Sequence, residues 1–208
     1  MKRIFIAIPT TGNIRIELLS FLLNITHNPN YLIKIDVTTS GDICNNRNYL
    51  TDRFLQTDSE WLIFIDSDIV PPMNLLDIID NSKDIISAIN FTWKDNELIP
   101  LIMKKEKMGY KLDQDIINRK ENSLRVDAVG LGCFIVKREV FKKINLPYFE
   151  FIYDKKGILI NGEDFNFCEK AKKAGFDIWI DKRFITNHFN IVNLKAINNM
   201  LGDLKNGK

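Results

Sequence analysis

The stretch WLIFIDSDIVPP, residues 61–72, runs five apolar residues directly into two aspartates and ends in two prolines. A short apolar run of this kind is typical of a buried strand. Side chains two residues apart on an extended strand point the same way, so Asp66 and Asp68 repel unless a cation lies between them. Carboxylates suit Mg²⁺ or Mn²⁺, which take phosphate oxygens as further ligands. We predict a divalent metal at Asp66 and Asp68; a solvated loop with helix-capping aspartates is the alternative.

Around this stretch, apolar strands alternate with helical patterns through the first half of the chain. Strands are predicted at 3–8, 31–38, 61–65 and 85–91, and helices at 14–23, 42–56 and 73–79. This alternation favours an α/β fold with a parallel sheet and right-handed crossovers. Ligands of such sheets bind beyond the carboxyl ends of the strands, which brings residues 9–12, 38–41 and 66–68 to one edge.

The second half of the chain has a less regular pattern. A hairpin is predicted at 99–112, two apolar stretches at 125–136, a strand at 176–180, and helices at 137–144, 163–173 and 191–204. No internal repeat or linker separates the halves. We therefore expect a single domain over 1–208, with a nucleotide-binding half at 1–95 and an acceptor and catalytic half at 96–208.

Composition excludes some classes of function. The 29 basic and 27 acidic residues give a net charge of +2, which offers no case for binding nucleic acid. The three cysteines form no CxxC and read as reduced thiols of a cytoplasmic protein. No apolar run approaches the ~18 residues that span a bilayer. The segment 191–208 leaves peripheral contact with the inner face of a membrane open, with core packing as the default.

Four further side chains are candidates for chemistry. Glu163 and Asp164 open a predicted helix, where the helix dipole favours acidic residues in any case. The apolar stripe of that helix omits Asp164, which leaves this carboxylate free to point into a cleft. Arg47 lies near a helix start, either as a solvated residue or as a bidentate phosphate ligand. His188 is either a structural histidine or a metal ligand.

Two glycines and one aromatic residue complete the candidates. Gly130 and Gly132 allow close approach of a ligand to the backbone, or simply a tight turn or bulge. Trp93 could contact an acceptor by stacking on a sugar ring, or pack in the core. The sequence has no P-loop, no GxGxxG and no GxSxG.

Taken in order, several motifs resemble glycosyltransferase family 2, whose members have the GT-A fold. They are IPT at 8–10, RN at 47–48, LIFIDSD at 62–68, GLGCFIVKREVF at 130–141, GEDFNFCEKAKKAG at 162–175, and His188. The resemblance extends from residue 4 to about residue 188. It implies a single-domain GT-A fold with a Rossmann-like, mostly parallel central sheet flanked by helices.

The resemblance also implies roles for the residues that match its motifs. Asp68 and His188 would hold Mn²⁺ or Mg²⁺, with Asp66 near the metal and the ribose. Asp164 would be the general base of an inverting transfer, supported by Glu163. The donor would be a nucleotide-diphosphate sugar, with UDP or GDP the leading candidates. The acceptor, whether a glycan, a lipid-linked sugar or a protein, stays open. The implied nucleotide-binding residues are Pro9, Thr10, Asp42, Arg47, Asp66 and Ser67.

Two other functions fit parts of the sequence. Residues 66–70 match the DxDx[TV] start of haloacid-dehalogenase-like phosphatases, in which the first aspartate attacks phosphorus. That motif normally follows the first strand of its domain, whereas two βα units come before it here. The second alternative is a catalytically inactive module that binds a sugar nucleotide and metal without transferring the sugar.

Overall fold

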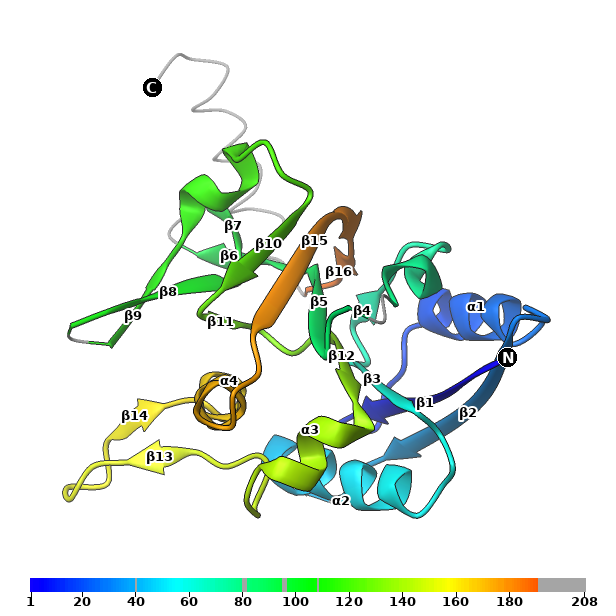
Figure 1. The fold of residues 1–208 in the computed structure, drawn as a ribbon, viewed down its shortest axis with the longest axis horizontal. Helices are drawn as coiled ribbons and strands as arrows, with labels where there is room; N and C mark the ends of the chain where they lie inside the picture. The colour runs from blue at the N-terminus through cyan, green and yellow to red at the C-terminus, as the bar shows by residue number, and fades with distance from the viewer. Residues whose placement is uncertain (40, 80–81, 95–96, 108, 191–208) are drawn as a thin grey trace.

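A seven-stranded sheet forms the centre of the computed structural model, which describes residues 1–39, 41–79, 82–94, 97–107 and 109–190 (Figure 1). In spatial order its strands are β10 (Ser123–Val126), β15 (Ile178–Ile185), β5 (Ile85–Ile89), β12 (Cys133–Lys137), β3 (Trp61–Ile65), β1 (Lys2–Pro9) and β2 (Tyr31–Thr38). Strands β1, β2, β3, β5 and β15 run in one direction, and β10 and β12 run in the other. The sheet is therefore mixed but mostly parallel.

Helices cover both faces of this sheet. They are α1 (Ile16–Ile25), α2 (Ile43–Leu55), α3 (Arg138–Lys143) and α4 (Glu163–Lys173), with 3₁₀ segments η1 (Leu75–Ile78) and η2 (Gln114–Asn118). Alternate residues of β1 separate two cores: Phe5 packs with α2, α3 and α4, and Ile6 packs with α1 and η1. This period of two is what a strand buried on both faces requires.

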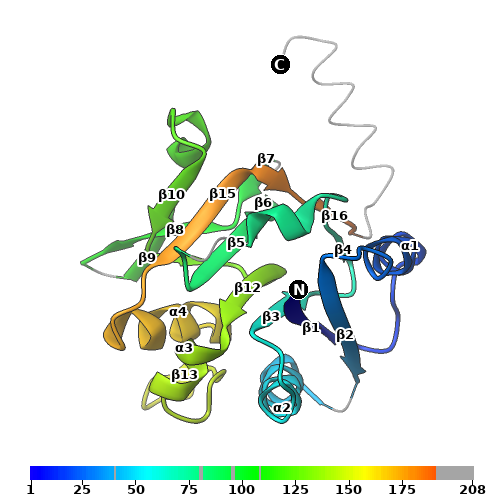
Figure 2. The same cartoon turned by 45° about the vertical axis from the view of Figure 1, so that its right-hand side comes forward.

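Short paired strands lie outside the central sheet. They are β6 (Phe91–Lys94) with β7 (Glu97–Pro100); β8 (Ile102–Glu106) with β9 (Gly109–Leu112) and β11 (Ala128–Val129); β13 (Ile152–Tyr153) with β14 (Leu159–Asn161); and β4 (Ile69–Val70) with β16 (Asn187–His188). Figure 2 shows the last pair between the sheet and α1.

The predicted α/β class and mostly parallel sheet are confirmed. Two details differ. Strand β12, which belongs to the second half of the chain, lies between β3 and β5 and runs antiparallel to both. The predicted helix at 73–79 is only the 3₁₀ turn η1. The division into two functional halves stays a prediction, although the second half supplies β10, β12 and β15 to the shared sheet.

The last predicted helix and the absence of a membrane span are the remaining structural predictions. The predicted terminal helix at 191–204 lies outside the described residues. Within the described residues, no helix combines the length and apolar character that crossing a membrane would need.

Candidate active site

The parallel strands all end at one edge of the sheet, and the candidate side chains gather there. Thr10 follows β1, Asp66 follows β3, and His188 follows β15. Backbone hydrogen bonds fasten these ends together: Thr10 N donates to Thr38 O at 3.0 Å, and Thr186 N donates to Ile89 O at 3.0 Å. The expected convergence of loops at the carboxyl edge is thus present in the structure.

A tight turn presents Asp66 and Asp68 at this edge. Asp66 N donates to Gly132 O at 2.9 Å, and Ile69 N donates back to Asp66 O at 2.9 Å. The chain then enters β4, which pairs with β16 so that His188 lies opposite Ile69. Phe189 N also donates to Asp68 O at 2.9 Å. This short ladder brings a histidine from the end of the described chain beside the aspartates.

Asp68 and His188 face each other with the chemistry of a metal-binding pair. Nε2 of His188 lies 3.4 Å from Oδ2 of Asp68. Nδ1 lies 2.6 Å from the carbonyl oxygen of Phe91, which can only accept, so Nδ1 carries the proton. A second ring nitrogen held in this way commonly orients a histidine toward a metal. Without a metal, their hydrogen bond raises the pKa of His188 and lowers that of Asp68.

These residues fit a divalent cation that is shared with a ligand. Among the described residues, no three histidine, cysteine or acidic side chains are close enough to form a complete protein cage. Asp68 and His188 form a pair, while Asp66 turns toward Arg47. Mg²⁺ and Mn²⁺ sites of this kind use one or two protein groups and complete their coordination with water and phosphate oxygens. The metal roles of Asp66, Asp68 and His188 stay predictions.

Arg47 joins the two acidic motifs through a buried guanidinium. Its Nη2 donates to both carboxylate oxygens of Asp66, at 2.9 and 3.2 Å, and its Nε lies 3.7 Å from Oε1 of Glu163. The guanidinium also lies over the ring of Phe64, 5.2 Å from its centre. The side chain of Arg47 is only 2% exposed. The ionic partners that the structure shows for it are the carboxylates of Asp66 and Glu163. Direct contact of Arg47 with a nucleotide stays a prediction.

The neighbouring Asn48 fastens the same helix to the chain that leads into α4. Its Nδ2 donates to Phe149 O at 2.7 Å, and its Oδ1 accepts from Phe149 N at 3.1 Å. Both residues of the RN pair therefore connect α2 to the second half of the chain. Sequence reasoning had not assigned this role to Asn48.

Asp164 has the environment of a proton acceptor that works near neutral pH. Burial, followed by the charge of Glu163, raises its pKa to about 7. Its Oδ1 accepts from Phe165 N at 2.8 Å, in the first turn of α4. A carboxylate with a pKa near the working pH combines a useful ionised fraction with basicity. Raised pKa values are typical of catalytic groups, and burial alone also produces them.

Two adjoining cavities open beside Asp66 and Asp68. One, of ≈ 260 Å³, is lined by Pro9, Thr10, Thr11, Gly41, Asp42, Ile43, Asn46, Asp66, Ser67 and Asp68. The other, of ≈ 610 Å³, shares Thr11, Ser67 and Asp68 and extends past Arg15 to Phe189. Together they form one cleft along the carboxyl edge. Five of the six predicted nucleotide-binding residues line it, and the sixth, Arg47, lies behind Asp66.

The cleft contains polar residues that sequence reasoning missed. Arg15 lines it on the side of Asp68, and its guanidinium lies over the ring of Phe189, 5.2 Å from the centre. Buried Asn46 presents an Oδ1 with no hydrogen-bond partner among the described residues. Arg15 follows a Thr-Thr-Gly turn after β1, and that position is the only sequence signal for it. Asp42 caps α2, accepting from Asn45 N at 2.9 Å.

The two glycines make room for protein side chains. A methyl group on Gly132 would lie 3.2 Å from Cγ1 of Ile69, and one on Gly130 would lie 3.1 Å from Cδ1 of Leu101. Trp93 is exposed on the β6–β7 hairpin, whose first residue, Phe91, accepts the hydrogen bond of His188. Contact of these three residues with donor or acceptor stays a prediction.

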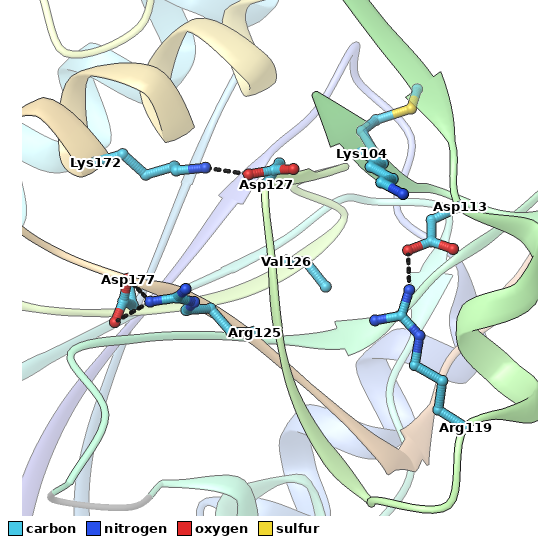
Figure 3. A pocket seen from close by; sticks show the side chains of 9 residues that line it. Lys104, Asp113, Arg119, Arg125, Val126, Asp127, Lys172 and Asp177 are labelled. Atoms are coloured by element: carbon cyan, nitrogen blue, oxygen red, sulfur yellow. Dashed lines mark hydrogen bonds and ion pairs between the residues drawn. The ribbon is translucent and has the colours of Figure 1, made fainter. Parts of the chain in front are cut away.

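A separate cavity of ≈ 340 Å³ is lined by charged side chains away from this cleft (Figure 3). Its carboxylates are paired with basic side chains: Asp127 with Lys172, Asp113 with Arg119 at 2.7 Å, and Asp177 with Arg125 at 3.3 Å. These ion pairs account for the three carboxylates that line this cavity.

The fold is similar to those of several solved proteins. A197 from STIV matches with a TM-score of 0.62 and 21% identity, over 92% of this chain and 87% of that chain. The catalytic domain of Drosophila β1,4-galactosyltransferase 7 matches with a TM-score of 0.52 and 15% identity, over 92% and 72%. GalNAc-T7 matches with a TM-score of 0.55 and 14% identity, over 93% of this chain but only 44% of that chain.

This chain has the GT-A fold. No family model and no curated protein sequence matches it. Membership of glycosyltransferase family 2 therefore stays a prediction, and at these identities the GT-A neighbours bear on the fold alone.

Proposed function

We propose that this GT-A protein is a metal-dependent glycosyltransferase that moves a sugar from a nucleotide-diphosphate donor to an acceptor hydroxyl with inversion. One observation carries the proposal: Arg47 holds Asp66, at the metal-binding edge, and Glu163, beside Asp164, in one buried cluster. Arg47 thus links a carboxylate that lines the cleft to the acidic pair that opens α4. Two solved neighbours support the choice of donor, since their structures contain UDP with Mn²⁺ and UDP-Gal with manganese.

In this proposal the side chains divide the work between donor and acceptor. Pro9, Thr10 and Asp42 line the pocket for the nucleoside. Asp68 and His188 would hold Mn²⁺ or Mg²⁺, which when bound neutralises charge on the leaving diphosphate. Arg15, on the same side of the cleft, supplies a second positive charge for that group.

Asp164 would remove the proton of the acceptor hydroxyl as its oxygen attacks the anomeric carbon of the sugar. The bond to the diphosphate breaks on the opposite face, which inverts the configuration. Burial keeps the Asp164 carboxylate basic enough for this step. Arg47 sets the position of Glu163 next to it.

The geometry favours a transferase over the phosphatase alternative. In the structure Asp66 is paired with the buried guanidinium of Arg47. Phosphatases of that family also use a lysine, and none of the described residues that line the ≈ 260 Å³ cavity is a lysine. They further use an acidic pair at the end of a strand, whereas Glu163 and Asp164 are the first two residues of helix α4.

Thermal unfolding with UDP, GDP, CDP and TDP, each with and without Mn²⁺, tests the donor site. A ligand at ~100 times its Kd adds about 2.7 kcal/mol, a rise in Tm of roughly 5–10 °C for a domain of this size. We expect one diphosphate to give this rise only with Mn²⁺, and Asp68→Ala to abolish it. No shift with any nucleotide would overturn the proposed donor site.

Sugar transfer itself requires a second test. With the sugars of the nucleotide so identified, Asp164→Asn should abolish transfer and leave nucleotide binding intact. Transfer that survives this change would rule out Asp164 as the base. Nucleotide binding without transfer to any acceptor by the wild-type protein would favour the inactive binding module.

A further inference from the structure

Strand β2 is the last strand of the central sheet and is paired on one side only. All eight of its residues pair with β1, and no strand of the described chain lies on its other side. The outer N–H and C=O groups of such a strand can pair with another strand. Natural proteins usually protect long edge strands with charges, bulges or a covering segment.

The surface around this edge is unusually apolar. On β2 itself, Leu32 is 48% exposed, and Ile35 and Val37 are also exposed. Helix α1 lies at the same end of the molecule in Figures 1 and 2, and its Ile16 is 70% exposed, with Leu23 exposed as well. Exposed apolar side chains beside an unpaired strand favour association with another chain.

The charges on the strand identify the partner. Lys34 and Asp36 flank Ile35, with opposite signs one residue to either side. We propose that two copies of this chain pair through β2, antiparallel and centred on Ile35. In this register Lys34 of each copy lies opposite Asp36 of the other, so that the edge is complementary to itself.

The pairing separates apolar and charged contacts onto the two faces of the sheet. Directly opposite residues of antiparallel strands point to the same face. Ile35 meets Ile35 and Ile33 meets Val37 on the face that carries α1, while the ion pairs form on the face that carries α2. Cross-strand pairs of both kinds stabilise sheets.

Other registers lose this complementarity. A parallel arrangement about a two-fold axis would place Lys34 beside Lys34 and Asp36 beside Asp36. An antiparallel register centred on Ile33 would place Lys34 opposite Leu32, and one centred on Val37 would place Asp36 opposite Thr38. Only the register centred on Ile35 matches both charges.

Both charged side chains remain able to reach a second copy. Within one copy, Lys34 contacts Asp58 at 3.2 Å, and Asp36 accepts from Nε of Arg53 at 3.1 Å and from Val37 N at 2.9 Å. These are pairs at the protein surface, of a kind that contributes little stability and exchanges easily with water. A carboxylate can accept further hydrogen bonds, so Asp36 can hold Arg53 and a lysine together.

Analytical ultracentrifugation of the full chain over a range of concentrations tests the proposal. The wild-type protein should form dimers. Lys34→Asp and Asp36→Lys each turn both attractive pairs into repulsive ones and should raise the dimer dissociation constant by roughly tenfold or more. Lys142→Asp, a matched reversal of an exposed lysine on α3, should leave dimerisation unchanged.

Mixing the two β2 variants is the decisive experiment. Lys34→Asp provides two acidic residues and Asp36→Lys two basic ones, so the mixture should form heterodimers although each variant alone dissociates. The double variant K34D/D36K should dimerise again. A monomeric wild-type protein, a dimer insensitive to both reversals, or a mixture that stays monomeric would each overturn the proposal. Circular dichroism verifies that each variant is folded.

Discussion

Replacing Arg47 with methionine should destabilise the protein far more than a typical surface change. Methionine keeps much of the length of the side chain but removes the guanidinium between Asp66 and Glu163. Removing one partner of a fully buried ion pair costs about 3–5 kcal/mol, because the other charge is left without compensation.

For Arg47→Met we expect a smaller loss of unfolding free energy than for a fully buried ion pair. Side chains of Asp66 and Glu163 are 30% and 14% exposed, so water can partly solvate them after the change. Methionine also retains packing against Phe64. Asp66 can take up a proton, since burial raises its pKa even with Arg47 present. We expect a loss of roughly 2–3 kcal/mol, a fall in Tm of about 5–10 °C.

Urea unfolding of four proteins measures the effect: wild type, Arg47→Met, Asp66→Asn and the double variant. The cycle should give a coupling energy of at least about 1 kcal/mol between Arg47 and Asp66. Arg53→Met is the matched control on the same helix. Its side chain is 51% exposed and pairs with Asp36, so its loss should cost under about 0.5 kcal/mol.

Similar unfolding free energies for Arg47→Met and Arg53→Met would refute this reasoning. A coupling energy near zero would do so too, since Arg47 would then not depend on Asp66. Arg47→Lys should recover part of the stability, because a lysine can reach one carboxylate but cannot span both.

Three further predictions concern His188, Asp164 and Gly132. His188→Gln should raise the Mn²⁺ concentration needed for the nucleotide-dependent Tm shift by roughly tenfold or more, and an unchanged requirement would remove His188 from the metal site. Because the pKa of Asp164 is raised from 3.8 to about 7, the folded protein loses stability as the pH rises toward 7. In urea unfolding, Asp164→Asn should therefore be more stable than wild type by roughly 1–3 kcal/mol at about pH 8, and this difference should shrink toward pH 4. The kcat/KM of the wild-type protein should fall below about pH 7, where Asp164 becomes protonated. Gly132→Ala should cost roughly 1–2 kcal/mol, since the added methyl group meets Ile69 at 3.2 Å, and an unchanged unfolding midpoint would contradict that packing.

The sequence predicted those features that depend on local periodicity. Strands β1, β2 and β3 lie within a residue or two of their expected positions because apolar runs bounded by turns specify them. Asp42 caps α2, a position at which aspartate is strongly preferred. The order of the sheet could not be read in this way, because β12 pairs with β3 and β5 through contacts between distant parts of the chain.

The site shows the same limit. Two aspartates after a buried strand are visible in a sequence, but the contact between Arg47 and Glu163 depends on how α2 and α4 pack across one face. For that reason the sequence offered Arg47 as a solvated residue or a phosphate ligand and did not predict its contacts with Asp66 and Glu163. The only sequence signal for Arg15 was its position after the Thr-Thr-Gly turn, since its place in the cleft follows from the path of the loop after β1.

The pairing of β4 with β16 sets the order in which the proposed metal site can form during protein synthesis. Asp68 leaves the ribosome long before His188, and the ladder between Ile69–Val70 and Asn187–His188 cannot close before β16, which follows β15 in the chain, has been synthesised. A nascent chain that stops short of β15 therefore carries the aspartates without the histidine. Capture of a metal and nucleotide would be a late event, reserved for chains whose central sheet is complete.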